Sequence, residues 1–599
     1  MAPKRRPAPR LAIVEDRHKI IVGLDYGTTY TGVSYVISGE SGIEDIQVVN
    51  QWPGNSESVF KVPSKIAYAA ENEKLQDDRW GFTVTPMHRS YVWTKLLLDS
   101  STQLTEFDDP SLKTFLGSGM MGLPVGKSAK EVCCDFLRGV YAHIVETLTR
   151  KYSQEIYDAT PVECWITVPA IWSDAAKHAT RDAAISAGFG ARPMDKVNVI
   201  TEPEAATLAA LKPHISENSL DPIVPGNGVL VCDCGGGTVD VTTYKILSAR
   251  PKLRFQELCV GIGGKCGSTA IDRNFNKWMI KTFGTKFTDI PEKRRAPSSL
   301  FMKSFEAAKR SFTGDGSMDP IEVYGLNMGD PFTYYDGEII NVPWDVIKRC
   351  FDPVIKDIIR LVQAQVDHAI QEGQFIHRII LVGGFGDSQY LNMCMKDWSM
   401  SQGIKLTCPP QCQAAVAKGA ALRGLEGTKP VSRLARRNYG YKCGVPFREG
   451  IDPDWTGYIN QWSGLKYCKN RLRWVVDYGQ TIDENTSATF DLHCAIFDDD
   501  PDPVSTYVDL HCCSLVHPPD HTKRNLTERI GQICVEFYRK DIVSAPRRYI
   551  ATKNGYGTYV KFETKMHMDA EEGILTFTSY TNYGERKQVG QAYIVFNQD

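Results

Sequence analysis

The sequence predicts an α/β protein of two lobes that face each other across a cleft, followed by a β-rich domain. Segments 20–30 and 229–240 carry this prediction, because each ends an apolar run with Asp-x-Gly and then supplies threonine. After each turn the apolar residues alternate with a period of two, which indicates a second strand and therefore a β-hairpin. Either turn alone is compatible with a simple tight hairpin. Together, in the same order, they indicate duplicated lobes.

The chemistry of the two turns indicates a phosphate clamp. Asp25 and Asp233 stand at the ends of apolar strands, where a carboxylate can hold Mg²⁺ through water. The neighbouring glycines let backbone N–H groups approach phosphate oxygens. Neither turn runs into a helix, as P-loops and dinucleotide-binding folds do, and a G-x-x-x-x-G-K-[ST] motif is absent. The sequence therefore predicts a nucleoside triphosphate site of another class.

Several helices are expected between and after these hairpins. The helical spacing of apolar residues predicts helices over 129–151 and 346–370, the latter started or kinked by Pro353. Another helix is expected over 174–188, where glycine ends it. These helices are expected to cover the sheets of the two lobes.

A third glycine turn supports the nucleotide-site prediction. Residues 376–382 have the apolar composition of a buried strand, and Gly383-Gly384 would let a flat base and ribose lie against the backbone. Asp387 or Ser388 is expected to cap the helix that follows.

Six segments in order carry a resemblance to a known family. They are Gly23–Tyr30, Ile166–Ala170, Thr201–Ala206, Asp233–Asp240, Glu306–Arg310 and Leu381–Gly384. This set is similar to the heat-shock protein 70 family, within the actin and sugar-kinase superfamily. The pattern resembles most the divergent, lidless branch known from fungi and animals. The resemblance implies a two-lobed actin-like ATPase, with duplicated ribonuclease-H-like lobes around a deep ATP cleft over residues 18–425.

The resemblance also implies roles for residues of the cleft. Asp25 and Asp233 would hold hydrated Mg²⁺, and Glu202 would orient the attacking water; with Thr238 they form the expected catalytic set. The residues expected to contact ATP or ADP are Gly27, Thr28, Thr29, Tyr30, Gly235, Gly236, Gly237, Gly263, Gly264, Glu306, Lys309, Arg310, Thr313, Gly383, Gly384 and Phe385.

Two of these assignments have simpler alternatives. Glu202 precedes Pro203, so it is also compatible with a buried acid at the start of a helix. Glu306 and Arg310 are four residues apart, so they are also compatible with a solvated pair on a helix surface.

One departure from the family pattern concerns hydrolysis. The family carries a lysine after its first hairpins, whose ammonium touches the γ-phosphate and the attacking water. The corresponding segment 79–89 contains no lysine, and Thr85 stands near the expected position. Loss of a preorganised cation can lower the rate by roughly 10²- to 10⁴-fold. Arg79, Arg89 or Lys95 are the candidate substitutes, and we expect ATP binding to survive this loss better than hydrolysis.

Composition indicates an ordinary multidomain protein. The chain of 599 residues is 42% apolar and 23% charged, with a net charge of −2, which gives no general attraction to nucleic acid or membrane. Residues 1–17 are expected to form a basic disordered tail without a secretory signal. Seventeen cysteines without a C-x-x-C pair indicate a reducing compartment. We expect a cytoplasmic monomer, with nuclear localisation as an alternative.

The sequence changes character after residue 425. Residues 426–439 are polar and basic and are expected to form a linker. The family's linker is short, apolar and acidic, and it docks on the ATPase to transmit the nucleotide state. A basic linker without those apolar residues predicts weak coupling between ATP and the following domain.

Residues 440–599 are expected to form a β-rich domain without a helical lid. Its predicted strands cover residues 470–477, 488–492, 559–564 and 574–580. Turns are expected at Asn554-Gly555, Gly557 and Glu572-Gly573. The domain occupies the position of the family's peptide-binding sandwich, so we expect it to bind a protein client or partner.

These observations predict an ATP-binding chaperone, or a chaperone-related regulator, with slow ATP hydrolysis. A small-molecule kinase of the same superfamily is the first alternative. A nucleotide-dependent scaffold without turnover is the second, and the missing lysine favours it.

Overall fold

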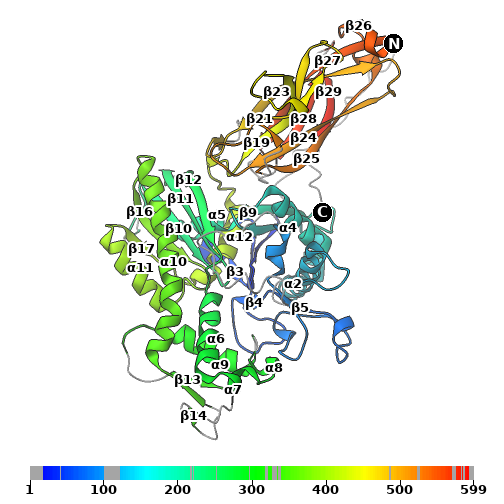
Figure 1. Ribbon diagram of the computed structural model, residues 1–599. Helices are drawn as coiled ribbons and strands as arrows, with labels where there is room; N and C mark the ends of the chain where they lie inside the picture. Colours follow the sequence, from blue (N-terminus) through cyan, green and yellow to red (C-terminus); the bar gives the residue numbers. More distant parts are fainter. Residues whose placement is uncertain are drawn as a thin grey trace, which may run out of the picture.

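The computed structural model describes residues 18–40, 42–99, 122–215, 219, 221–250, 252–295, 297, 299–316, 321–326, 333–334, 339–483, 487–522, 526–568, 575–581, 583 and 587–592. Figure 1 shows two α/β lobes side by side and a β-rich body beyond them. The predicted fold class, two α/β lobes followed by β-structure, is confirmed. The expected tail, residues 1–17, lies outside the described residues.

The first lobe is built on a sheet in the order β3-β2-β1-β8-β9, with β4 also pairing with β2. Its strands are β1 (Ile20–Tyr26), β2 (Tyr30–Ile37), β3 (Gln47–Val48), β4 (Lys61–Pro63), β8 (Val162–Val168) and β9 (Lys196–Thr201). Strands β1 and β2 form the predicted antiparallel hairpin, in which Asp25 faces Gly32. Strand β8 is parallel to β1, so the sheet combines a hairpin with a crossover connection.

The second lobe repeats this arrangement, in the order β12-β11-β10-β16-β17. Its strands are β10 (Gly228–Cys234), β11 (Val239–Ser248), β12 (Arg254–Gly264), β16 (Ile376–Val382) and β17 (Lys405–Thr407). Strands β10 and β11 form the second predicted hairpin, and β16 is parallel to β10. The two central sheets therefore share one strand order, as expected for duplicated lobes.

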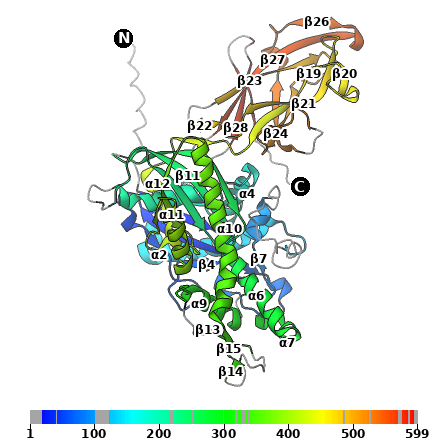
Figure 2. The ribbon, with the colours of Figure 1, turned by 60° about the vertical axis from the view of Figure 1, so that its left-hand side comes forward.

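The predicted helices are confirmed, with small shifts at their ends. They correspond to α2 (Ala129–Tyr152), α4 (Asp174–Ala187) and α10 (Trp344–Gln371). Ser173 caps α4 by accepting a hydrogen bond from the Ala176 backbone N–H, and Gly188 follows the helix end. Helix α10 contains Pro353 in its interior, so this proline does not start the helix. In Figure 2, α10 runs the length of the second lobe.

The other helices and the two small sheets complete the lobes. The helices are α3 (Gln154–Ala159), α5 (Glu202–Leu211), α6 (Thr269–Phe283), α7 (Thr285–Thr288), α8 (Glu292–Arg295), α9 (Leu300–Ser311), α11 (Gln389–Ser401) and α12 (Ala415–Glu426). The small sheets contain β5 (Lys65–Ala67), β6 (Arg79–Trp80) and β7 (Tyr91–Val92), and β13 (Ile321–Tyr324), β14 (Thr333–Tyr334) and β15 (Ile339–Val342).

Helices α5 and α12 hold the two lobes together at the base of the cleft. One buried apolar cluster includes Ile21 of β1, Val231 of β10 and Ile380 of β16, together with residues of both helices. A Cβ atom at Gly419 of α12 would lie 1.7 Å from the carbonyl oxygen of Ala205, so the two helix backbones touch there. This contact fixes the start of α5, which carries Glu202, relative to both sheets.

The C-terminal β domain contains two main sheets around its own apolar core. Its strands are β19 (Asn438–Pro446), β20 (Gly457–Ile459), β21 (Lys466–Val476), β22 (Thr481–Asp483), β23 (Ser487–Phe497), β24 (Val504–Cys513), β25 (Glu528–Phe537), β26 (Arg547–Ile550), β27 (Gly555–Met568), β28 (Leu575–Thr581) and β29 (Lys587–Ala592). No α-helix occurs among the described residues after Glu426.

One turn prediction in this domain is wrong. Gly557 lies inside β27, where it faces Arg548 of β26, because the turn is already made at Asn554 in a left-handed conformation. The Asn554-Gly555 turn is confirmed. The predicted turn at Glu572-Gly573 lies outside the described residues.

The connector, residues 427–437, is held against the two α/β lobes. Its strand β18 (Ser432–Leu434) pairs with β22 of the C-terminal β domain. On the other side, Arg433 donates to Glu204 of α5 at 2.7 Å, and Arg436 is ion-paired with Glu257 of β12. The basic composition predicted weak coupling, because the apolar residues of the family's linker are missing. The contacts that the connector makes are charged, and buried carboxylates receive it.

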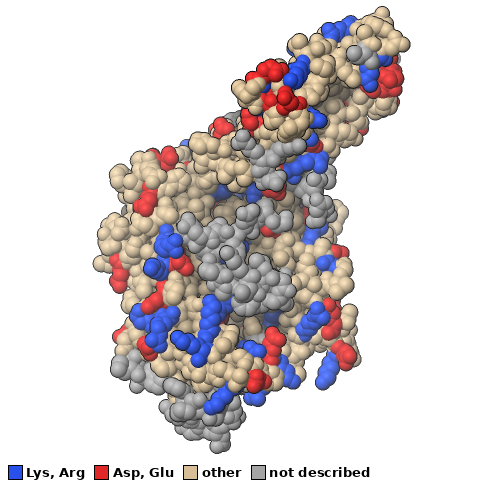
Figure 3. Space-filling view, viewed as in Figure 1, with Lys and Arg blue, Asp and Glu red and all other residues tan. Residues whose placement is uncertain are grey.

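Charged side chains of both signs are spread over the surface that Figure 3 shows. On the face in Figure 3, basic and acidic side chains are interspersed over both the lobes and the C-terminal β domain. Within the described part of the chain, none of the helices is long and apolar enough to cross a membrane.

Candidate nucleotide-binding site

The two predicted glycine turns meet between the lobes. A Cβ atom at Gly236 would lie 2.3 Å from Thr29 Oγ1, and one at Gly237 would lie 3.2 Å from Thr28 Cγ2. The β1–β2 turn and the β10–β11 turn are therefore in contact, although they are far apart in the sequence. The glycines of the second turn thus lie against the threonine side chains of the first.

Three carboxylates gather behind the turns. Asp25 ends β1, Asp233 lies near the end of β10, and Glu202 begins α5; all three are buried. Burial, and next the charge of Glu202, raises the pKa of Asp233 well above its ordinary value. Burial also raises the pKa of Glu202, against the opposing effect of Lys95. Carboxylates this crowded are stabilised in their charged form by a cation.

The site has the donor chemistry of a hydrated Mg²⁺ site. Asp240, which faces Asp233 across the β10–β11 hairpin, has a buried Oδ1 atom without a hydrogen-bond partner among the described residues. Burial, followed by the charge of Glu202, raises the pKa of Asp240 to about 7. A hard divalent cation with bound water would use these features: oxygen ligands, several negative charges and an unsatisfied carboxylate oxygen.

Lys61 belongs to this site, and sequence reasoning did not identify it. Its Nζ donates to Asp25 Oδ2 at 2.7 Å. The sheet register explains this contact: Lys61 of β4 faces Gly32 of β2, which faces Asp25 of β1. A Cβ atom at Gly32 would lie 3.3 Å from Lys61 Cγ, so the glycine leaves room for the lysine to cross the hairpin.

Of the three candidate substitutes for the missing lysine, Lys95 reaches the site. Its Nζ donates to Glu202 Oε1 at 2.7 Å, and it lies 5.5 Å from the ring of Tyr26 and 5.1 Å from that of Trp172. Lys95 comes from a 3₁₀ helix, Thr94–Leu98, and its side chain is only 1% exposed. Glu202 is thus both the first residue of α5 and one half of a buried ion pair.

The other two candidates and the expected lysine position lie on the surface. Arg79 and Thr85 are exposed, and exposed Arg89 lies 3.7 Å from Glu71. None of the three contacts the carboxylate cluster in the interactions of the described residues. Segment 79–89 therefore supplies no cation to the cleft.

The residues predicted to hold the ribose and base form a charged group on α9. Lys309 is buried and bonds Asp272 at 2.8 Å and Glu306 at 2.6 Å, while Arg310 bonds Glu306 at 2.8 Å. The group is therefore more than a solvated pair, because a buried lysine joins it.

The third glycine turn closes the site from the second lobe. Gly383 has φ of 89°, and a Cβ atom there would lie 2.3 Å from Asp233 Oδ1, so only glycine fits. Gly384 is exposed. Ser388, and not Asp387, caps α11 by accepting from the Leu391 N–H.

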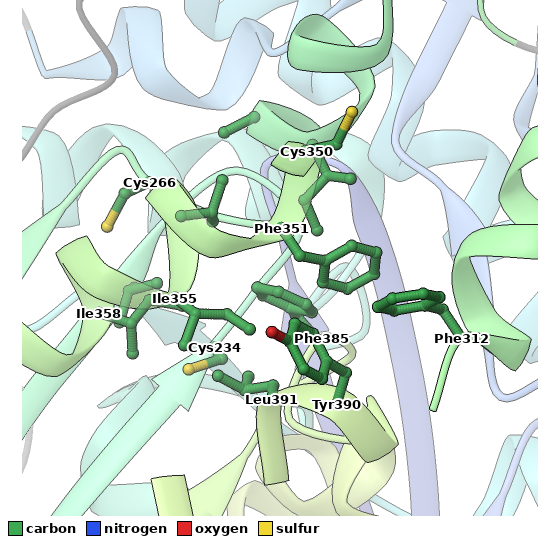
Figure 4. Close-up of a cluster of buried hydrophobic side chains, with 14 of the residues drawn as sticks. Cys234, Cys266, Phe312, Cys350, Phe351, Ile355, Ile358, Phe385, Tyr390 and Leu391 are labelled. Atoms are coloured by element: carbon green, nitrogen blue, oxygen red, sulfur yellow. The ribbon is translucent and has the colours of Figure 1, made fainter. Parts of the chain in front are cut away.

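One residue of the predicted contact set has its side chain in the apolar core. The Phe385 ring is buried and packs 6.2 Å from Phe351, within an apolar cluster that includes Phe312 and Tyr390 (Figure 4). Its backbone N–H donates to the Cys234 carbonyl oxygen. The Phe385 side chain thus packs in the apolar core beside the turn.

The remaining predicted residues lie near these groups. Gly263 and Gly264, at the end of β12, face Asp240 and Val239. A Cβ atom at Gly263 would lie 3.1 Å from Asp240 Oδ1, so its size matters to the carboxylate cluster. Thr313 follows α9 and is partly buried.

The two lobes share one strand order, and their hairpin turns and carboxylates meet between them. This arrangement defines an actin-like ATPase fold. A family model described as Hsp70 protein matches residues 21–435, more than half of the chain. The chain belongs to the Hsp70 family.

The chain is similar to several curated relatives. It is 25% identical to human heat shock 70 kDa protein 12B over 74% of each chain, and 24% identical to mouse heat shock 70 kDa protein 12A over 77% of each. It is also 24% identical to a chaperone protein HscA homolog of Vibrio parahaemolyticus, over 70% of this chain and 60% of that protein.

Proposed function

We propose that this protein is a chaperone-related member of the Hsp70 family that binds ATP with Mg²⁺ and hydrolyses it slowly. The contact between the two glycine turns, directly in front of three buried carboxylates, carries this proposal. Backbone N–H groups of 235–238 and the hydroxyls of Thr28 and Thr29 would bind the β- and γ-phosphates. Asp25 and Asp233 would hold hydrated Mg²⁺, which would neutralise phosphate charge.

Glu202 would orient the attacking water. It begins α5 at the base of the cleft, and Lys95 fixes one of its oxygens. Thr238, the last residue of the turn before β11, would stabilise the same phosphate end of the nucleotide. Catalysis of this kind depends mainly on positioning and charge.

Substitution of the two aspartates should weaken Mg²⁺-dependent ATP binding. Asp25→Asn and Asp233→Asn each remove a charge from the proposed cation site, so we expect about a tenfold or greater loss of affinity for each variant. Titration calorimetry with ATP and Mg²⁺ measures this loss. Asp135→Asn is the matched control, because Asp135 is ion-paired on α2 with Lys127 and Arg138. Unchanged affinity in both cleft variants would contradict the site assignment.

Glu202→Gln should reduce hydrolysis while leaving ATP binding nearly intact. A group that acts mainly in the transition state changes the rate more than the affinity, and the loss expected for a general base is about 10²-fold or more. Single-turnover phosphate release, alongside calorimetry, separates the two effects. Normal hydrolysis by this variant would mean that the carboxylate is structural.

A nucleotide-dependent scaffold without turnover is the second candidate. The observation that favours it is the direct bond from Lys95 to Glu202, which occupies one oxygen of the proposed water-orienting carboxylate. ATP binding without measurable phosphate release in the wild-type protein would select this candidate.

The C-terminal β domain is the proposed binding region for a protein client or partner. Exposed apolar side chains lie around the short edge strand β20 and its neighbours, at Ile451, Trp455, Ile459 and Leu465. Grouped exposed apolar residues are typical of protein-binding surfaces. The proposed location is the cytoplasm.

A further inference from the structure

We propose that Lys61 is the phosphate-binding cation of this cleft, so that its ammonium contacts the terminal phosphate of ATP. This inference rests on the proposed function. It assigns to a residue of β4 the position that the resemblance gives to a lysine in segment 79–89, where Thr85 is exposed.

The backbone places Lys61 beside the phosphate clamp. Strand β4 pairs with β2 directly after the glycine turn, with Tyr30 facing Pro63 and Gly32 facing Lys61. The Ser64 N–H donates to the Thr29 carbonyl oxygen, and the Ser64 hydroxyl donates to that of Gly27. The strand that carries the lysine is thus attached to the turn predicted to bind phosphate.

The side chain has the orientation and donors that the role requires. It crosses Gly32 to reach Asp25, and 16% of it remains exposed. An ammonium has three N–H donors. One is bonded to Asp25, and no other described residue accepts from Nζ, so two donors remain for a ligand.

Lys61 brings a positive charge to a region of buried carboxylates. Its Nζ lies 2.7 Å from Asp25 Oδ2 of the first lobe, and buried Asp233 is supplied by the second lobe. A phosphate entering this crowded anionic region meets Lys61 as its compensating charge.

Lys95 cannot take the same role. Only 1% of its side chain is exposed, and it is enclosed between the rings of Tyr26 and Trp172 with Glu202 in front of it. Lys95 acts through Glu202 and is a positioning residue. The two lysines thus divide the tasks: Lys61 contacts phosphate, and Lys95 orients the carboxylate.

The alternative is that Lys61 only neutralises Asp25 and never touches nucleotide. The two roles predict different discrimination between ATP and ADP. A cation at the terminal phosphate of ATP stabilises ATP more than ADP, whereas a structural ion pair affects both nucleotides equally.

Calorimetry of the full-length Lys61→Met and Lys61→Arg variants with ATP·Mg²⁺ and ADP·Mg²⁺ tests the inference. We expect Lys61→Met to lose about 10- to 100-fold in ATP affinity and about threefold or less in ADP affinity, with part of the ATP loss restored in Lys61→Arg. Lys19→Met is the control, because Lys19 pairs with Glu163 at 2.5 Å at the opposite end of β1; it should leave both affinities unchanged. An equal loss for ATP and ADP, or no loss, would overturn the inference.

A measurement on the wild-type protein keeps the test independent of variant folding. Reductive methylation followed by peptide mass spectrometry should show Lys61 protected by ATP more strongly than by ADP, with Lys19 modified alike in both. Equal modification of Lys61 with the two nucleotides would also overturn the inference. If the wild-type protein binds neither nucleotide, the proposed function fails and the inference fails with it; if it binds both and Lys61 does not discriminate, only the inference fails.

Discussion

Lys95→Met is expected to destabilise the first lobe by about 3–5 kcal/mol, because it leaves the buried Glu202 carboxylate without its cation. The two side chains are bonded at 2.7 Å, and neither has substantial contact with solvent. Without Lys95, the burial that raises the pKa of Glu202 loses its largest opposing effect. A carboxyl group whose pKa is raised in the folded state contributes least to the stability of the fold at high pH. The loss of stability in Lys95→Met should therefore grow as the pH rises through that pKa.

The double variant Lys95→Met/Glu202→Gln should recover most of this stability, because it removes both buried charges together. Chemical denaturation followed by tryptophan fluorescence measures the cycle, and Trp172 beside Lys95 provides a local reporter. Lys130→Met is the control: Lys130 pairs with Asp182 at 3.3 Å with both side chains partly exposed, so we expect about 1 kcal/mol or less. If Lys95→Met lost as little stability as the control variant, Lys95 and Glu202 would not be a buried, energetically coupled pair.

The Arg433→Gln/Arg436→Gln variant is expected to release the connector from the ATPase lobes. Arg433 bonds buried Glu204, and Glu257 accepts from both Arg436 and the Leu434 N–H. Charge-assisted bonds contribute about 1.5–3 kcal/mol each, so the loss of both should make amide exchange in the connector about 10²- to 10⁴-fold faster. Hydrogen exchange with mass spectrometry over 427–437 measures this, especially at Val431 and Leu434, whose N–H groups bond to Phe255 and Glu257.

Arg437→Gln is the matched control for this variant. Arg437 is the next residue along the connector, but it pairs with Glu528 of the C-terminal β domain at 2.9 Å. We expect it to leave exchange at Val431 and Leu434 unchanged. Equal protection in the double variant and the wild type would show that the two ion pairs do not hold the connector. If ATP also changes exchange across 427–437 in the wild type, the connector transmits the nucleotide state.

The sequence was most informative where the structure is local. The hairpins of β1–β2 and β10–β11 were predictable, because apolar alternation and glycine turns act within about ten residues. The helices α2, α4 and α10 were predictable from apolar spacing and caps. Only the family resemblance indicated that Asp25, Glu202 and Asp233 belong to one site. They are far apart in the sequence, so no local pattern connects them.

What the sequence did not reveal depends on contacts between distant segments. Lys61 lies on a strand of three residues, too short to show alternation, and its role appears only when β4 pairs with β2. Lys95 follows Trp93, whose left-handed backbone starts an irregular 3₁₀ segment. The acceptors of the connector arginines are 229 and 179 residues away. The core position of the Phe385 side chain was not predictable, because a phenylalanine beside a glycine turn is equally suited to a ligand or to a core.

The ion-paired connector gives this protein an unusual response to its solvent. Apolar contacts are strengthened by sulfate and other excluded salts. Ion pairs between partly exposed arginines and buried carboxylates are instead weakened, to a limited extent, as ionic strength rises. A junction between domains that is held by Arg433 and Arg436 therefore loosens at high concentrations of such salts, whereas an apolar junction would tighten. The strength of the contact between the α/β lobes and the C-terminal β domain is thus tied to the ionic environment, and it is greatest in buffers of low ionic strength.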